Sequence, residues 1–163
     1  MPPNTDPIPV LILNNLEAAL ALPDGGNNYY FDVNVVRVGE SPLDQIVAPA
    51  VVIGDVGVMG KYMEEKNGSV LWHSNLHWRI QIYGVVPYSS ASGEANRNLT
   101  KLAADIYRAV MVDYTRGGLA INTTWIGWEV SGPPSEDDQR PWLACELDIH
   151  FRTRDNEMVT NPA

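Results

Sequence analysis

The chain has 163 residues, of which 45% are hydrophobic and 19% are charged, the composition of one globular domain with a single sizeable core. Its formal net charge of −9 disfavours sequence-independent binding to nucleic acid, because such binding requires a basic surface. The single cysteine, Cys145, excludes an internal disulfide, and the lack of an apolar run of about 18 residues predicts no membrane span. We expect one domain over residues 1–163, with an ordered core over about 7–153 between short polar tails.

A first helix is predicted to begin near Asp6 and Pro7, where a capping side chain is followed by proline. It should end at the Pro-Asp-Gly-Gly sequence of residues 23–26. Apolar residues recur at spacings of three and four along this segment, which is typical of a helix with one buried face. They are Ile12, Leu13, Leu16, Ala19 and Leu20.

Strand-forming residues dominate the next part of the chain. Residues 29–38 are rich in β-branched and aromatic side chains, with a change of phase at Val36 that suggests a bulge, and residues 48–53 form a shorter apolar strand. A hairpin is then predicted from about Val56 to Val85, with the tight-turn dipeptide Asn67-Gly68 at its tip. Its flanks are long relative to the core, so we expect the tip to project.

The second helix has the clearest pattern in the chain. Ser92 is the expected N-cap, and Glu94 lies in the first turn, where a negative charge suits the helix dipole. The Arg-Gly-Gly sequence of residues 116–118 should stop the helix. Its apolar stripe consists of Ala95, Leu99, Leu102, Ile106 and Val110.

A closing hairpin is expected over residues 119–128 and 142–152. Residues 143–151 alternate between apolar and polar side chains, and residues 76–82 repeat this period of two, so each segment predicts a strand with one dry face. We therefore predict an α+β fold: a single mixed or antiparallel sheet with two main helices packed on one face and a projecting β-hairpin. The shared core should contain Ile80, Ile82, Leu99, Leu102, Ile106, Leu143, Leu147 and Ile149.

No set of residues in the sequence forms a recognisable catalytic or metal-binding motif. His73 and His77 lie about 13 Å apart if the segment is a strand, too far to share one ion. The acidic run at residues 136–138 lacks the spacing of a calcium loop, and the glycines of residues 54–60 match no phosphate-binding motif. We expect no catalytic, cofactor-binding or metal-binding residues, so the protein is predicted not to be an enzyme.

The order of these elements resembles the tail terminator, or tail completion, family of long-tailed bacteriophages (minor tail protein U-like). The resemblance covers residues 10–152 and includes the pattern Leu-x-x-Leu-Ala-x-x-Ile-Tyr from Leu99 to Tyr107. It implies a non-enzymatic virion protein that assembles in the host cytoplasm and acts at the tail–neck junction. It also implies a homo-oligomeric ring, expected to be a hexamer, that contacts the tail tube protein and a neck or connector protein. DNA would pass through its lumen without specific binding.

Two other classes stay open from the sequence. Another neck or tail ring protein would share the composition, and a small-ligand-binding α+β domain would require a pocket with converging polar groups. Candidate interface residues are sought among apolar side chains outside the core, because aromatic residues and methionine are enriched at protein interfaces. Trp125 and Trp128 face opposite ways in a regular strand, so at least one should lie outside the core. The full candidate set is Tyr62, Met63, Glu64, Glu65, Lys66, Trp125 and Trp128.

Overall fold

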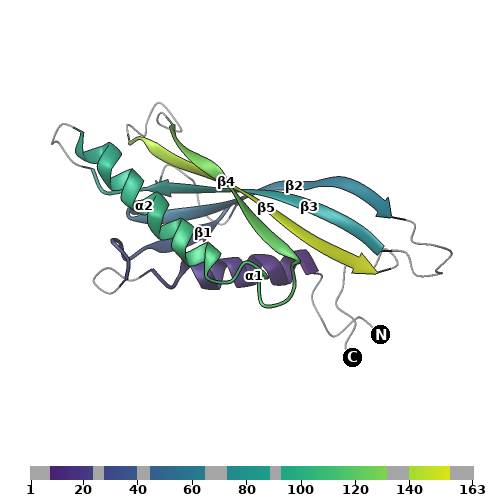
Figure 1. The fold of residues 1–163 in the computed structure, drawn as a ribbon. Coiled ribbons are helices and arrows are strands. Elements are labelled where there is room, and N and C mark those ends of the chain that lie inside the picture. Colours follow the sequence, from purple (N-terminus) through teal and green to yellow (C-terminus); the bar gives the residue numbers. More distant parts are fainter. Residues whose placement is uncertain are drawn as a thin grey trace.

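The computed structural model describes residues 8–23, 28–39, 45–64, 73–88, 93–131 and 140–154. Within them the sheet has the strand order β1-β2-β3-β5-β4, in which β1 and β2 are parallel and every other neighbouring pair is antiparallel. This single mixed sheet with helices on one face is the α+β fold predicted from the sequence (Figure 1). The elements are α1 Ile8–Leu20, β1 Asn34–Arg37, β2 Ala50–Glu64, β3 His73–Val85, α2 Glu94–Met111, β4 Asn122–Ser131 and β5 Trp142–Arg154.

The strand β2 is longer than the sequence predicted. The prediction of a short strand over residues 48–53, followed by a separate hairpin from Val56, is wrong, because β2 runs without a break and pairs with β3 as far as Glu64 opposite His73. The pairing shifts between Asp55 and Val58 and again after Met59, so the glycines in this region accompany bulges instead of a strand end. Residues 65–72 lie outside the described part, and the projecting tip stays a prediction.

The strand β1 is shorter than predicted. Only Asn34–Arg37 of the 29–38 segment pairs as a strand, in parallel with β2. The Arg37 guanidinium ties β1 to α1, with an ion pair of 2.5 Å to Glu17 and a hydrogen bond of 2.6 Å to the side chain of Asn14. Before β1, the backbone amides of Tyr30 and Phe31 bond to a side chain of α2, as described below.

Both helices bury one apolar stripe against the sheet. In α1 the buried residues are Ile8, Ile12, Leu16 and Leu20, which recur at every fourth position. The helix α2 begins after Gly93, which has a φ of 74° and provides no side-chain cap, so the predicted cap at Ser92, itself outside the described residues, is wrong by one position.

One core fills the space between the helices and the sheet. All eight residues predicted to be buried together belong to it. Gly84 allows α2 to approach β3 closely, because a Cβ atom there would lie only 2.7 Å from Leu102 Cδ2. We call this side of the sheet the helix face and the other side the open face. A smaller cluster covers one end of the open face and contains Ile46, Ala50, Val52, Val85 and Trp142.

A tight turn after α2 reverses the chain and leads it into β4. Arg116 has a φ of 53°, and Gly117 and Gly118 follow with φ values of 69° and 84°. The Arg116 side chain is fully buried and donates to the carbonyl oxygens of Val110 and Asp113, so it caps the end of the helix. The Asp113 carboxylate accepts hydrogen bonds from the Thr115 amide (3.0 Å), the Thr115 hydroxyl (2.7 Å) and the Gly117 amide (2.6 Å). These bonds lower the pKa of Asp113.

Neither of the two described helices is long and apolar enough to cross a membrane.

Leu147 tests the assignment of the core. Because its side chain is fully buried between β5 and the helices, we expect Leu147→Ala to lower the free energy of unfolding by about 2–5 kcal/mol through the cavity it leaves. Urea denaturation followed by circular dichroism measures this change. The exposed Val112, changed to alanine, is the control and should shift stability by about 0.5 kcal/mol or less. Equal stabilities for the two variants would contradict the core assignment.

The bonds of the Asp113 carboxylate in this turn predict that Asp113→Asn lowers stability, by an amount that depends on pH. At neutral pH the variant should be about 1–3 kcal/mol less stable, because the amide has no charge and only one acceptor oxygen, so it cannot accept from both Thr115 and Gly117 as the carboxylate does. Since the folded pKa of Asp113 is lowered, the stability from its charge is complete above the ordinary value of 3.8 and is lost as the pH falls through the folded pKa. Denaturation curves between pH 2 and 7 should therefore converge at the acidic end; a constant difference would refute the assignment. Glu129→Gln, at an exposed position, serves as the control.

Candidate interface site

A groove of about 450 Å³ lies between α2 and the edge strand β4. We call it the aromatic groove, because two tryptophans and one tyrosine supply much of its wall. Alanine and aromatic side chains make up most of its lining, and the groove is open to solvent. The residues that line it are Thr100, Ala103, Ala104, Tyr107 and Arg108 from α2 and Trp125 and Trp128 from β4.

A bulge in β4 brings the two tryptophans into this groove. The pairing with β5 shifts between Trp125 and Gly127, so Trp125 lies opposite Leu147 and Trp128 lies opposite Cys145. Leu147 and Cys145 both belong to the core on the helix face. The prediction that the tryptophans face opposite ways is therefore wrong. The extra residue of the bulge shifts the alternation of side chains by one position, so two residues three apart lie on the same face.

The groove presents aromatic surface to solvent. Tyr107 is 48% exposed and Trp128 is 44% exposed, whereas Trp125 is half-buried and packs against the core. The rings of Tyr107 and Trp125 meet edge to face, with centroids 5.2 Å apart. Val130 of β4, which lies on the same face of the sheet as the two tryptophans, is also exposed. Aromatic side chains are enriched at protein interfaces, so the groove is a candidate interaction site.

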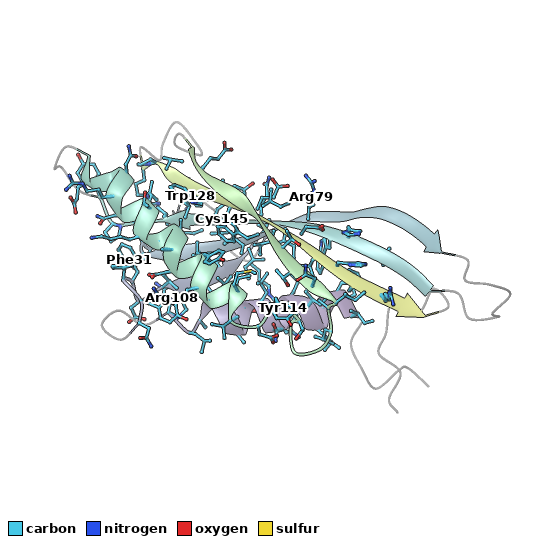
Figure 2. All side chains as sticks on the ribbon, in the orientation of Figure 1. Phe31, Arg79, Arg108, Tyr114, Trp128 and Cys145 are labelled. Carbon is cyan, nitrogen blue, oxygen red and sulfur yellow. The ribbon has the colours of Figure 1, made fainter. Side chains whose placement is uncertain are left out.

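Basic side chains run along α2 beside the groove. Arg97, Lys101 and Arg108 are all exposed and are spaced by four and seven residues, so they share one side of the helix. We call them the basic stripe. Lys101 lies 5.6 Å from the centroid of the Tyr30 ring, and Arg108 lies 5.8 Å from that of Tyr29 and donates to the Asn28 carbonyl. Figure 2 shows Arg108 beside α2, on the side of the sheet away from Arg79.

A buried carboxylate fixes the segment that carries these tyrosines. Asp105 is 1% exposed, and its oxygens accept hydrogen bonds from the Tyr30 amide at 3.0 and 3.1 Å and from the Phe31 amide at 3.0 Å. Burial raises the pKa of Asp105, while the two amides and the nearby charge of Arg108 oppose that shift. These bonds take up the Tyr30 and Phe31 amides, which are therefore not available for pairing in the sheet.

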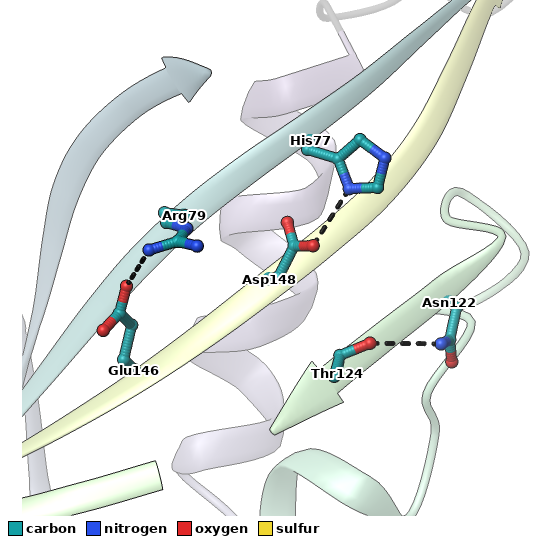
Figure 3. A network of polar contacts seen from close by, with 6 residues as sticks. All are labelled: His77, Arg79, Asn122, Thr124, Glu146 and Asp148. Atoms are coloured by element: carbon teal, nitrogen blue, oxygen red, sulfur yellow. Dashed lines mark hydrogen bonds and ion pairs between the residues drawn. The ribbon is translucent and has the colours of Figure 1, made fainter. Parts of the chain in front are cut away.

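The open face carries a row of polar pairs across β3 and β5 (Figure 3). Arg79 Nη1 lies 3.0 Å from Glu146 Oε1, and His77 Nδ1 lies 2.9 Å from Asp148 Oδ2. The ring of His150 stacks on His77, with centroids 4.4 Å apart. These two histidines are far apart along the chain, but the pairing of β3 with β5 sets them directly opposite each other.

Among the described residues, the candidates for a nucleophile or a metal ligand are Cys145 and the acidic and histidine side chains. Burial raises the pKa of the Cys145 thiol to about 12, so it is a poor nucleophile at neutral pH. Within the described ranges no group of three or more acidic, histidine or cysteine side chains could hold a metal ion. Trp128 also borders a smaller hollow of about 240 Å³ on the open face beside Gly127, whose polar lining residues are Gln81, Glu129 and Glu146.

The predicted interface residues fall into two places. Trp125 and Trp128 meet in the aromatic groove. The backbone of Tyr62, Met63 and Glu64 forms the last pairs of β2 with β3, while their side chains, and Glu65 and Lys66 entirely, lie outside the described residues. Sequence reasoning missed Tyr107, Ala104 and Arg108, although Gly127 within a strand was a signal of the bulge.

A scan against models of protein families finds no match, and a search of curated proteins finds none either.

The carboxylate anchor predicts a local and measurable effect of Asp105→Ala. The Tyr30 and Phe31 amides would lose their acceptors, so the variant should be destabilised by about 1–3 kcal/mol and these two amides should exchange with solvent faster than before. Amide hydrogen exchange measured by NMR resolves both positions. Asp32→Ala, in the same segment but exposed, should leave their exchange rates unchanged. Unaltered exchange in Asp105→Ala would show that other contacts hold the segment.

Proposed function

We propose that this protein is a structural virion protein: a phage tail terminator whose subunits form a ring that ends the tail tube and joins it to the head–neck. The observation that carries the proposal is the aromatic groove, which offers exposed tryptophan and tyrosine at the edge of a sheet. Such side chains are the common anchors of protein interfaces.

The order of the elements supports the same proposal. The resemblance to the tail terminator family rests on an amphipathic helix, a set of strands with a long hairpin, a second helix and a closing hairpin. The described chain has these elements in this order, α1, β1, β2, β3, α2, β4 and β5, and both helices cover one face. The pattern that begins at Leu99 lies on α2 and supplies both core residues and the groove residue Tyr107.

A ring requires contacts between two different surfaces of each subunit. The sheet has two unlike edges, the short parallel strand β1 and the long antiparallel strand β4, and only β4 lies beside the aromatic groove. A surface of this kind suits a head-to-tail contact, in which each copy offers one surface to the copy before it and another to the copy after it. When the rotation between copies closes, such contacts give a ring.

The test is electron microscopy of phage tails assembled with this protein. We expect ring density for the protein at the end of tails of uniform length, and tails of uncontrolled length when Trp128→Lys replaces it, because a charge in the groove blocks the contact. The matched control is Val112→Lys, which places the same charge at an exposed position outside the groove lining. Tail ends that carry no density for the wild-type protein would refute the proposal.

A further inference from the structure

The outer side of α2 is basic, although the whole chain is acidic. The formal net charge is −9, yet Arg97, Lys101 and Arg108 of the basic stripe share one exposed side of the helix. The acidic residues of α2 do not offset this charge at the surface, because Glu94 is the first residue of the helix and Asp105 is buried. The stripe and the aromatic groove beside it therefore favour an occupant that combines carboxylates with an apolar side chain.

The smaller hollow on the open face has this combination. It has a volume of about 240 Å³, and its lining includes the carboxylates of Glu129 and Glu146. Ile126 lines the same hollow and is 46% exposed. Glu146 already pairs with Arg79, but Glu129 is exposed and forms no ion pair with any residue in the described part of the chain. We call this surface the acidic hollow, and Glu129 gives it a charge that another molecule can neutralise.

The sheet separates the acidic hollow from the basic stripe of the same chain. Glu129 directly follows Trp128 in β4, and consecutive strand residues point to opposite faces. Trp128 lines the aromatic groove, on the helix face. In Figure 2, Arg79, the partner of Glu146, and Arg108 of the basic stripe lie on opposite sides of the sheet. A contact between the two surfaces must therefore join different molecules.

The shapes of the two surfaces suit such a contact. Both described helices pack on the helix face (Figure 1), so neither of them covers the acidic hollow. The outer side of α2 is convex, and the long side chains of the basic stripe extend from it, whereas the hollow is concave. A helix laid on a sheet face is also the layer packing that this domain uses within one chain.

We infer that the acidic hollow binds the basic stripe of a second copy of this chain, an assignment that rests on the proposed ring function. The carboxylates of the hollow meet Arg97 and Lys101, and Ile126 enters the aromatic groove of the neighbour. The contact is head to tail, because each copy offers its open face to one neighbour and its helix face to the other. It specifies which faces meet in the ring, and it makes assembly sensitive to salt, because the paired charges lie at an exposed surface.

Charge reversal tests the pairing of the two surfaces. The stripe variant is Arg97→Glu with Lys101→Glu, and the hollow variant is Glu129→Lys. Each should weaken assembly by roughly tenfold or more, since like charges then face each other. A chain with all three changes should regain most of the lost assembly, because the charges are exchanged and not removed. Val112→Lys, at an exposed position outside both linings, is the control and should assemble as the wild type does.

Assembly is measured by native mass spectrometry, and on tail tubes by electron microscopy. A far-UV circular dichroism spectrum of each variant shows whether it is folded, so that a loss of assembly is not confused with a loss of structure.

Cysteine cross-linking measures the contact directly. Ile126→Cys and Ala104→Cys, both at exposed positions, are prepared as separate single variants and mixed under mild oxidation. We expect a heterodimer that neither variant forms alone. The native Cys145 does not compete, because it is buried and burial raises its pKa to about 12. Val112→Cys, mixed with Ile126→Cys, is the control and should give no cross-link.

The outcomes separate this inference from the proposed function. Rings that form without the cross-link, or a three-change chain that stays as weak as its parents, overturn the contact between hollow and stripe and leave the ring intact. Wild-type protein that stays monomeric both alone and with tail tubes overturns both. Assembly rescued by charge exchange, together with the specific cross-link, establishes the contact.

Discussion

The contact between α2 and the middle of the sheet determines most of this structure. Leu102 lies against Gly84 on β3, where a Cβ atom would come within 2.7 Å of Leu102 Cδ2 and force that side chain to shift. This close approach buries the apolar side of α2 against β3 and β5 and leaves its other side to solvent. The same helix therefore supplies core residues, the Asp105 anchor for the 28–33 segment, and one wall of the aromatic groove. A change in its position would alter all three.

The aromatic groove arises because the sheet is wider than the two helices that pack on it. The two helices pack over the central strands, and β4 lies at the edge, where Trp128 and Val130 stay exposed on the side that faces α2. The turn built by Asp113 and Arg116 leads the chain directly from α2 into β4 and so sets the separation of the two walls. The groove is thus a consequence of how the domain closes.

The features that could be predicted from the sequence are those that local periodicity determines. The alternation in β5 and the three-and-four spacing in α2 gave the sheet, the helices and all eight shared core residues. The sequence did not predict contacts between distant segments. The Asp105 carboxylate, which binds Tyr30 and Phe31, looked like an ordinary polar position on a helix, and this contact is why the predicted 29–38 strand was too long. The two tryptophans were placed on opposite faces because strict alternation takes no account of a bulge, which depends on pairing with β5.

The bulge also bears on how copies of this chain can associate. An exposed edge strand with regular hydrogen bonding invites another strand to extend the sheet, and a bulge interrupts that ladder. In β4 the irregularity falls between Trp125 and Gly127, in the middle of the edge and directly beside the groove. The bulge weakens strand addition at this position, and at the same position it turns both tryptophans toward α2. One local distortion therefore interrupts the edge of the sheet and places a side-chain surface beside it, a combination that would suit the ring proposed above.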